Sequence, residues 1–343
     1  MTKRGSAVPP LDEFGRIRAW TEGRQSKKWM VEAGVTLGIG DDAAVVAGGT
    51  SATEWLLAMD TMVEEVHFLD ATMSESDVGY KALAANISDI AAMGGTPKFA
   101  LVSVSVPPAW NAERMKLLFD GLYECADKYQ VAVIGGDTTS APSHLVVAVT
   151  LMGFVEAGKA VRRDGARPGQ SVFLTGPTGL SAGGLHGLLN NIGSIPARLA
   201  QAHQRPSPSV KAGRLLLETG WAASLNDVSD GVASEAWEIA EASGVRLLLK
   251  ETLLPISGEL ASYALEHGIQ PLDLVLYGGE DYVLLGTVDK QHEHSMKDRF
   301  RREGIPLFII GEVEAGEPGV AIQSASGKVK PMDKRGYNHF SKG

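Results

Sequence analysis

GIGDDAAV, residues 38–45, places two adjacent carboxylates between a flexible Gly-Ile-Gly turn and an apolar run. The run from Ala43 to Val46 is typical of a buried strand, and it follows Asp41 and Asp42 directly. Adjacent carboxylates repel each other and burial raises their pKa values, so a buried pair needs a divalent metal ion or a basic partner. Taken alone, the stretch is also compatible with a solvated surface turn, because Asp is common in turns.

The same combination of an acidic residue beside glycine or at the end of an apolar run recurs along the chain. The residues that share it are Asp41, Asp42, Asp60, Asp89, Asp137, Asp227, Asp230, Glu280 and Asp281. Hard oxygen ligands without clusters of His or Cys select Mg²⁺, Mn²⁺ or Ca²⁺ over zinc. One such turn is ordinarily structural, but the recurrence favours a site in which several metal ions serve phosphate chemistry.

The bulk composition sets limits on fold and partners. A chain of 343 residues with 44% hydrophobic and 21% charged residues predicts a globular protein of two domains. The formal net charge of -9 argues against a nucleic-acid partner, because such binding depends on Lys and Arg at the phosphates. A nucleotide held through metal ions remains compatible with an acidic chain.

Cysteine usage and the N-terminal sequence bear on location. The single cysteine, Cys125, excludes an internal disulfide and a Cys-based zinc site, and its helical apolar surroundings predict a buried side chain. The N-terminal MTKRGSAVPP lacks the apolar segment of a signal peptide, and no stretch is long enough to span a membrane. We therefore expect a cytoplasmic protein without a membrane partner.

Strands and helices alternate through the first half, which predicts an α/β or α+β unit that closes near Gly158. We expect one or two amphipathic helices with Leu11 and Ile17 on one face, and Asp60 at the carboxyl end of a strand, where α/β proteins place ligand-binding groups. The expected helices of this half are 11–33, 74–93 and 111–130, and the expected strands are 54–59, 99–106, 131–140 and 145–155.

The second half predicts a separate unit. The expected helices are 181–190, 210–219 and 235–243, the expected strands are 172–175, 245–249, 282–288 and 307–313, and residues 197–209 are expected to form a loop. The chain contains neither G-x-x-x-x-G-K-[ST] nor the protein-kinase H-R-D loop. If ATP binds, metal ions must balance much of the phosphate charge.

Eight ordered blocks carry a resemblance that covers residues 38–340. They are GIGDDAA, the D-T-x-V-E-x-x-H-F pattern, YKALAANISDIAAMGG, IGGDTT, RRDGARPG, DVSDG, GGEDY and GYNHF. The chain resembles the thiamine-monophosphate kinase family, of the superfamily that includes aminoimidazole ribonucleotide synthetase. The resemblance implies an α/β N-terminal domain over residues 1–158, whose strands form a barrel with a partner in a homodimer, and an α+β C-terminal domain over residues 159–343. The active site would lie between them.

The resemblance also implies an activity and a set of site residues. The activity is ATP-dependent phosphorylation of thiamine monophosphate to thiamine diphosphate, assisted by several Mg²⁺ ions. The implied metal ligands are Asp42, Asp60, Asp89, Asp137, Asp227 and Asp230; the implied ATP contacts are Gly136, Asp137, Arg163 and Ser229; and the implied substrate contacts are His67, Glu280 and Tyr337. No general base is expected, because the acceptor is already a phosphate monoester with an ionised oxygen.

Departures from the family pattern and two alternatives accompany this interpretation. The departures are Ala58-Met59 for a frequent Ser or Thr, Glu65 for a frequent Gly, Ser209 for a frequent Arg, and Val283 for a frequent Glu. One alternative is another member of the superfamily, although Cys125 matches neither the N-terminal Cys of selenophosphate synthetase nor the C-terminal Cys of the hydrogenase-maturation ATPase. The other alternative is a catalytically silent protein that binds ATP and thiamine phosphate.

Overall fold

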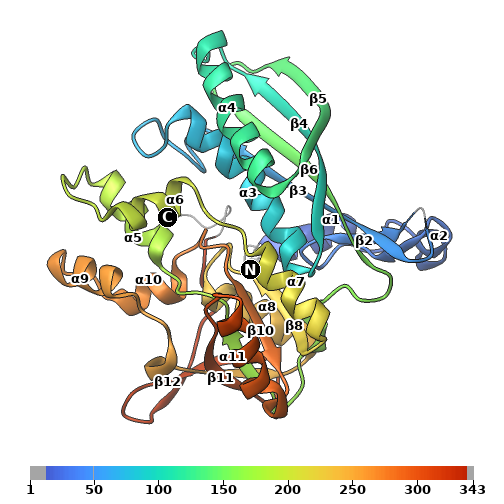
Figure 1. The fold of residues 1–343 in the computed structure, drawn as a ribbon, viewed down its shortest axis with the longest axis vertical. Helices are drawn as coiled ribbons and strands as arrows, with labels where there is room; N and C mark the ends of the chain where they lie inside the picture. Colours follow the sequence, from blue (N-terminus) through green and yellow to red (C-terminus); the bar gives the residue numbers. More distant parts are fainter. Residues whose placement is uncertain (1–12, 49, 338–343) are drawn as a thin grey trace, which may run out of the picture.

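Two mixed sheets organise the chain, one in each half of the sequence (Figure 1). The computed structural model describes residues 13–48 and 50–337. Leu11 and the last three residues of the GYNHF block therefore lie outside the described residues. The architecture confirms the predicted two-part combination of α/β and α+β structure.

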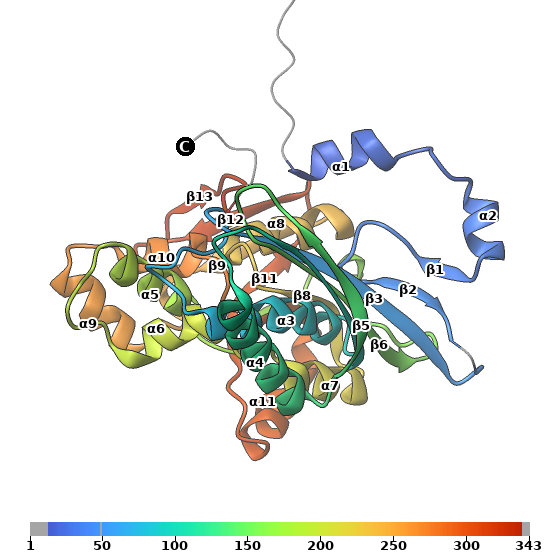
Figure 2. The ribbon, with the colours of Figure 1, turned by 90° about the horizontal axis from the view of Figure 1, so that it is seen from above.

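The first sheet has six strands in the order β1-β2-β3-β6-β4-β5. The central pair, β3 and β6, runs antiparallel over eleven residues each, whereas β4 and β5 pair in parallel. The strands are β1 (Val35–Leu37), β2 (Ala44–Ala47), β3 (Thr53–Val63), β4 (Thr96–Val106), β5 (Ala132–Ser140) and β6 (Val146–Glu156). The short helices α1 (Glu13–Thr21) and α2 (Lys27–Glu32) lie beyond its β1–β2 edge (Figure 2).

Helices α3 (Glu75–Ala92) and α4 (Ala112–Tyr129) cover one face of this sheet. Their ends confirm the predicted caps: Ser74 and Asp77 form a capping box, and the Asn111 side chain accepts from the second and third residues of α4. The two helix backbones touch through glycines, since a Cβ on Gly79 would lie 1.8 Å from the Leu118 carbonyl oxygen. This close approach fixes how α3 presents its polar residues to the rest of the chain.

The opposite face of the first sheet is exposed and partly apolar. Met59 of β3 is 63% exposed, Leu101 of β4 42% and Ile134 of β5 57%. The alternation of side chains along the strands places Ala58, Ala100 and their neighbours under α3, so these three residues point the other way. A face of this kind is a candidate protein–protein surface.

The second sheet has seven strands in the order β13-β12-β9-β11-β7-β10-β8. They are β7 (Ser171–Leu174), β8 (Ala222–Asp227), β9 (Arg246–Lys250), β10 (Leu284–Val288), β11 (Phe308–Glu314), β12 (Gly319–Gln323) and β13 (Val329–Pro331). The helices of this half are α5 (Leu180–Leu189), α6 (Ala197–Gln204), α7 (Val210–Thr219), α8 (Val232–Ser243), α9 (Gly258–Glu266), α10 (Pro271–Tyr277) and α11 (Glu293–Arg302). Three 3₁₀ turns complete it, at Arg163–Gly165, Glu251–Leu253 and Lys290–His292.

Two apolar cores hold the molecule together. One joins the first sheet, α3 and α4 to α7, α11 and the near face of the second sheet, and it includes Leu83, Leu216, Phe173 and Phe300. The other lies between the second sheet and the helices α8, α9 and α10. Arg214 of α7 adds a polar link, because it donates to the Gly94 carbonyl at 2.9 Å and to Glu156 of β6 at 2.7 and 3.0 Å.

Most of the predicted elements are present, and three predictions are wrong. Residues 197–209 are not all loop, since α6 occupies the first part of this range; its prolines lie just outside the helix. Strand β3 continues to Val63, so Asp60 lies inside the strand and not at its end. Tyr282 precedes β10 and has a left-handed backbone, with φ of 52°. Cys125 is buried, as expected, and burial raises the pKa of its thiol to about 12.

A membrane-spanning helix would need about 20 consecutive apolar residues. Among the residues that the structure describes, no helix is long and apolar enough to meet this requirement.

Candidate active site

A cavity of about 790 Å³ lies where α3 and the turn after β3 meet α5, α6 and the loops around residues 229–230 and 277–282. Its size suits a small organic ligand together with phosphate groups. Seven of the predicted site residues line it: Asp60, His67, Asp89, Ser229, Asp230, Glu280 and Tyr337. Residues from both halves of the sequence therefore form one site.

Three carboxylates converge beside this cavity. Ligand atoms of Asp42, Asp89 and Asp227 all lie within 4.8 Å of one another, although the residues come from the turn before β2, from α3 and from the end of β8. Burial and the neighbouring acids raise the pKa of Asp227 to about 6 and those of Asp42 and Asp89 well above the usual value. The short contact of Asp227 with the Ser88 hydroxyl, at 2.5 Å, opposes this shift.

The cluster fits a divalent cation. The Oδ2 atom of Asp42 is buried and has no hydrogen-bond partner, which leaves a full acceptor site unsatisfied. All three side chains offer hard oxygen ligands, and their mutual repulsion would fall when a cation binds. The cation would lie next to the cavity, because Asp89 belongs to the cluster and also lines the cavity.

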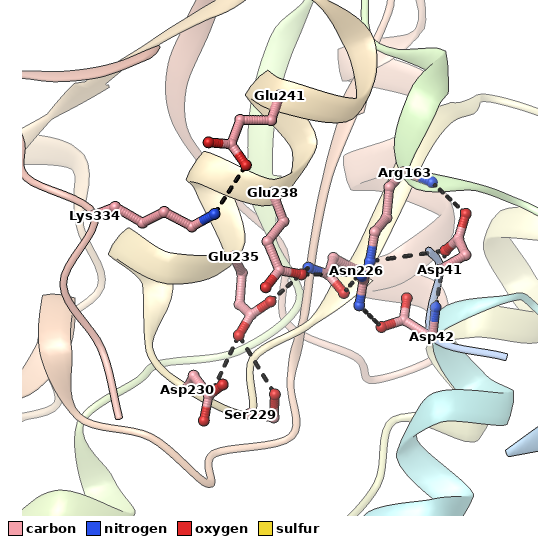
Figure 3. A network of polar contacts seen from close by, with 10 residues as sticks. All are labelled: Asp41, Asp42, Arg163, Asn226, Ser229, Asp230, Glu235, Glu238, Glu241 and Lys334. Carbon is pink, nitrogen blue, oxygen red and sulfur yellow. Dashed lines mark hydrogen bonds and ion pairs between the residues drawn. The ribbon is translucent and has the colours of Figure 1, made fainter. Parts of the chain in front are cut away.

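Arg163 is the cation that the chain itself supplies to this cluster (Figure 3). Its guanidinium contacts Asp42 Oδ1, donates to Asn226 Oδ1 at 3.2 Å and pairs with Glu238 at 3.1 Å. Asp41 accepts from the Asp42 amide at 3.0 Å and from the Arg163 amide at 3.3 Å, so it orients the turn and the arginine. Arg162, in contrast, pairs with Asp164 on the surface. The side chain of Arg163 is therefore mostly buried among these acidic residues.

Two further acids on α8 were not predicted from the sequence. Glu235 accepts from Asn226 at 2.5 Å and from the Asp230 amide at 3.0 Å, and the Ser229 hydroxyl lies 3.4 Å from it (Figure 3). Burial, followed by the charge of Glu238, raises the pKa of Glu235 well above its usual range. Glu235 thus fixes the loop that carries Ser229 and Asp230. Its position four residues after the end of the DVSDG block was the available signal.

The remaining predicted metal and nucleotide residues take different positions. Asp60 lines the cavity, and its amide donates to Asn86 Oδ1 at 3.0 Å. Gly136 and Asp137 lie on the exposed strand β5, outside both the three-carboxylate cluster and the cavity lining. Gly136 is sterically required there, since a Cβ would meet the Val102 carbonyl oxygen at 1.8 Å.

The predicted substrate residues surround the cavity. His67 Nδ1 accepts from the Val63 amide at 2.9 Å, which fixes its ring. Tyr337 is half exposed, and its amide donates to the Asp230 carbonyl at 3.3 Å. Glu280 has a left-handed backbone, with φ of 65°, and its amide donates to the Ser229 carbonyl at 2.6 Å. The three residues therefore come from well-defined local structures.

Lys81 and His203 are cavity residues that sequence reasoning missed. Lys81 Nζ lies 2.6 Å from Glu280 Oε2, and His203 Nδ1 lies 3.3 Å from the same oxygen. Burial alone would raise the pKa of Glu280, but Lys81 and His203 lower it to about 2. A lysine inside the apolar run of α3 was a usable signal, because Lys81, Ala85 and Asp89 recur every four residues and all line the cavity.

Three departures from the family pattern have a structural context. Glu65 has φ of 66°, a backbone conformation that favours glycine, and its carboxylate pairs with His144 at 3.0 Å near the cavity. Ser209 donates to the Tyr282 carbonyl at 3.1 Å, in the loop that carries Glu280. Ala58 lies under α3, whereas Met59 points to the exposed face of the sheet.

Comparisons with known proteins identify the family of this chain. Residues 40–155 match the family described as AIR synthase related protein, N-terminal domain, and residues 167–323 match its C-terminal domain. Thiamine-monophosphate kinase of Bacillus subtilis (strain 168) is 41% identical over 96% of this chain and 100% of its own length. The chain belongs to the thiamine-monophosphate kinase family.

Other members of the thiamine-monophosphate kinase family support the assignment. The Escherichia coli (strain K12) enzyme is 34% identical over 96% of this chain and 98% of its own length. A solved structure described as AaThiL complexed with AMPPCP and TMP is 33% identical, covers 98% of this chain and 100% of that chain, and superposes with a TM-score of 0.81. Family membership therefore confirms both the resemblance and the two-domain fold, and it identifies the chain as a kinase.

Proposed function

We propose that the chain transfers the terminal phosphoryl group of ATP to thiamine monophosphate and forms thiamine diphosphate and ADP. The observation that carries the proposal is the Asp42–Asp89–Asp227 cluster, which adjoins a cavity lined by the substrate residues that the family resemblance implies. The relatives provide independent support, since they are named thiamine-monophosphate kinases and one was solved with AMPPCP and TMP.

Metal ligands in this proposal are Asp42, Asp60, Asp89, Asp137, Asp227 and Asp230. Divalent ions such as Mg²⁺, when bound, would neutralise the charge of two polyphosphate groups that must approach each other. The strongest support is for Asp42, Asp89 and Asp227. Their ligand atoms lie close together, and the one arginine beside them cannot balance three negative charges. Asp60 and Asp230 face the same cavity, and Asp137 is assigned by the resemblance alone.

The chain's own residues would bind and align the two substrates. Glu235 holds the loop of Ser229 and Asp230 in place, and Glu280, His67 and Tyr337 line the part of the cavity proposed for thiamine monophosphate. The aromatic ring of Tyr337 can stack on the cationic thiazolium. Because the acceptor oxygen is already ionised, no side chain has to remove a proton.

Arg163 and Gly136 complete the proposed nucleotide contacts together with Asp137 and Ser229. The guanidinium of Arg163 is held by Asp42, Asn226 and Glu238, so a contact with phosphate would require it to exchange one of these partners. Arginine suits this role, because its planar fork can pair with a carboxylate or with a phosphate.

The assembly and location are also proposals. A homodimer would cover the apolar side chains of Met59, Leu101 and Ile134, which supports a barrel formed by the first sheets of two subunits. The proposed domains are residues 1–158 and 159–343, and the proposed compartment is the cytoplasm. Neither nucleic acid nor a membrane has a role in this function.

A coupled assay for ADP tests the proposal. The purified chain, ATP, Mg²⁺ and thiamine monophosphate should yield ADP and thiamine diphosphate in equal amounts. Unphosphorylated thiamine is the matched control, and it should give no ADP above background because it lacks the ionised acceptor oxygen. Nucleotide binding without ADP formation from thiamine monophosphate would support the silent-binder alternative.

A further inference from the structure

We propose that Lys81 and His203 are positioning residues that orient Glu280 for recognition of the phosphoryl acceptor. The inference rests on the proposed function and deepens it, because neither residue was assigned a role by the sequence or by the family resemblance. It concerns how the substrate contact at Glu280 is built.

Both residues contact a single oxygen of Glu280. Lys81 Nζ lies 2.6 Å from Oε2, and His203 Nδ1 lies 3.3 Å from it. No described residue donates to the other oxygen, Oε1, and the carboxylate belongs to the cavity lining. The geometry commits one oxygen to the protein and leaves the other for a ligand.

Burial makes this arrangement rigid. The side chain of Lys81 is only 1% exposed and that of His203 2%, whereas that of Glu280 is 29% exposed. The hydroxyl of Ser181 lies 3.2 Å from the same nitrogen of His203, Nδ1, and so adds a second contact at the atom that faces Glu280. A buried ammonium group without its carboxylate would be costly, so Lys81 has a strong reason to keep Glu280 in one place.

The charges indicate what Glu280 can recognise. Lys81 and Glu280 form a neutral pair, and burial lowers the pKa of His203, which keeps its imidazole neutral at pH 7. A carboxylate only accepts hydrogen bonds, so Nδ1 carries the proton in its contact with Oε2. Glu280 therefore acts as an oriented acceptor for an N–H group of the substrate more than as a free negative charge.

The two positioning residues come from different halves of the chain. Lys81 lies on α3, which packs on the first sheet, and His203 lies on α6, which belongs to the second half. The backbone of Glu280 is left-handed, a conformation that persists in a non-glycine residue only when its surroundings hold it. Correct placement of Glu280 thus depends on contacts from both halves.

Steady-state kinetics of Lys81→Met, Glu280→Gln and the double variant test the inference. We expect Lys81→Met to raise the KM for thiamine monophosphate about tenfold and the KM for ATP less than about twofold. In the Glu280→Gln background the same substitution should change the KM for thiamine monophosphate less than about twofold, because its target is already altered. Lys116→Met, on the exposed face of α4, is the matched control and should match the unmodified enzyme.

His203→Gln is a second variant in case Lys81→Met folds poorly, and it should raise the same KM by about threefold with thermal melting unchanged. Equal effects of Lys81→Met in both backgrounds, or equal changes in the two KM values, would overturn the positioning role. An unmodified enzyme that forms no ADP would instead overturn the proposed function and the inference with it. If the unmodified enzyme forms ADP and the variants have the same KM values as it has, only the inference is overturned.

Discussion

Glu280 and the Asp42–Asp89–Asp227 cluster adjoin the same cavity, but the chain balances their charges in opposite ways. Glu280 has a lysine and a histidine on one oxygen, and its pKa falls to about 2. The three aspartates share one arginine, which also serves Glu238, and the pKa of Asp227 rises to about 6. Burial acts on both groups, so the difference comes from the number of cations that the protein provides.

This difference separates two tasks. A carboxylate with its own buried cation keeps its charge and direction at any physiological pH, which suits recognition of an organic substrate. Carboxylates with too few protein cations are left with a surplus of negative charge, which suits a site that takes up divalent ions. Three experiments test this contrast between Glu280 and the three aspartates.

Asp89→Asn should have the largest effect. No side chain among the described residues pairs with the Asp89 carboxylate, so the substitution removes one like charge and one proposed metal ligand together. We expect kcat to fall about 100-fold or more, the stabilisation by Mg²⁺ to disappear, and the melting temperature of the metal-free protein to rise by about 2 °C. Kinetics and thermal melts with EDTA or Mg²⁺ measure these changes.

Asp127→Asn provides the matched control for that variant, because Asp127 is exposed on α4. It should leave kcat and the response to Mg²⁺ unchanged. Retention of full turnover by Asp89→Asn would remove Asp89 from the metal site and with it the contrast with Glu280.

The pH dependence of metal-free stability should be the next largest effect. The pKa of Asp227 is about 6 in the folded chain against 3.8 as the ordinary value, so the folded state binds this proton more tightly than the unfolded state. As pH rises from about 4 to about 6, the contribution of Asp227 should lower the free energy of unfolding. Above that range its contribution should be constant. Added Mg²⁺ should restore stability most at the upper end.

Thermal melts from pH 4 to pH 8, with EDTA and with Mg²⁺, measure this dependence. The melting temperature of Asp227→Asn should fall less between pH 4 and pH 6, because the contribution of the Asp227 carboxyl is absent. A metal-free protein that becomes more stable across the same interval, in step with Asp227, would contradict the sign.

Glu156→Gln should have the smallest effect, and it calibrates the Glu280 side of the comparison. Hydrogen bonds from Arg214 lower the pKa of Glu156 to about 2, which is also the value for Glu280. Glu156 is, however, 41% exposed and is not among the residues that line the cavity. A lowered pKa means that the ion pair contributes above pH 4.5 and is lost as pH falls through about 2. We expect a loss of less than about 1 kcal/mol at pH 7 and unchanged kinetics.

Urea denaturation at pH 7 and near pH 2 checks this expectation. The difference between the variant and the unmodified chain should shrink at the lower pH, where Glu156 is already protonated in the unfolded state and is becoming protonated in the folded state. A change in either KM would show that the Arg214 link reaches the site.

The sequence was most informative where chemistry is local. Ser74 with Asp77 and Asn111 mark helix starts because their side chains bond to amides two or three residues away, and both starts are confirmed. The two prolines and the polar residues of 197–209 predict a loop, but the first part of the range is helix α6, in which Leu199 is fully buried. The apolar run of residues 54–59 predicts a strand that ends at Asp60, but β3 continues past this charged residue to Val63.

The predicted residues of the site that line the cavity come from recognisable acidic blocks, but their partners do not. Lys81 and Glu280 are far apart in the chain, and nothing in the local sequence of either residue indicates the other. The same holds for Arg163 and Asp42, whose guanidinium and carboxylate meet because the 3₁₀ turn Arg163–Gly165 contacts the turn before β2. Such pairs depend on tertiary packing, which periodicity and caps do not encode.

The apolar core that runs from the first sheet through α3 and α7 to the second sheet limits how the enzyme can move. Gly213 of α7 lies so close to Ala91 of α3 that an added Cβ would be 2.1 Å from its carbonyl oxygen. Because the two halves share this closely packed core, they cannot move apart by a hinge motion without losing buried contacts. Substrates would therefore enter and leave at the rim of the cavity, where Glu65 and Tyr337 are among the lining residues.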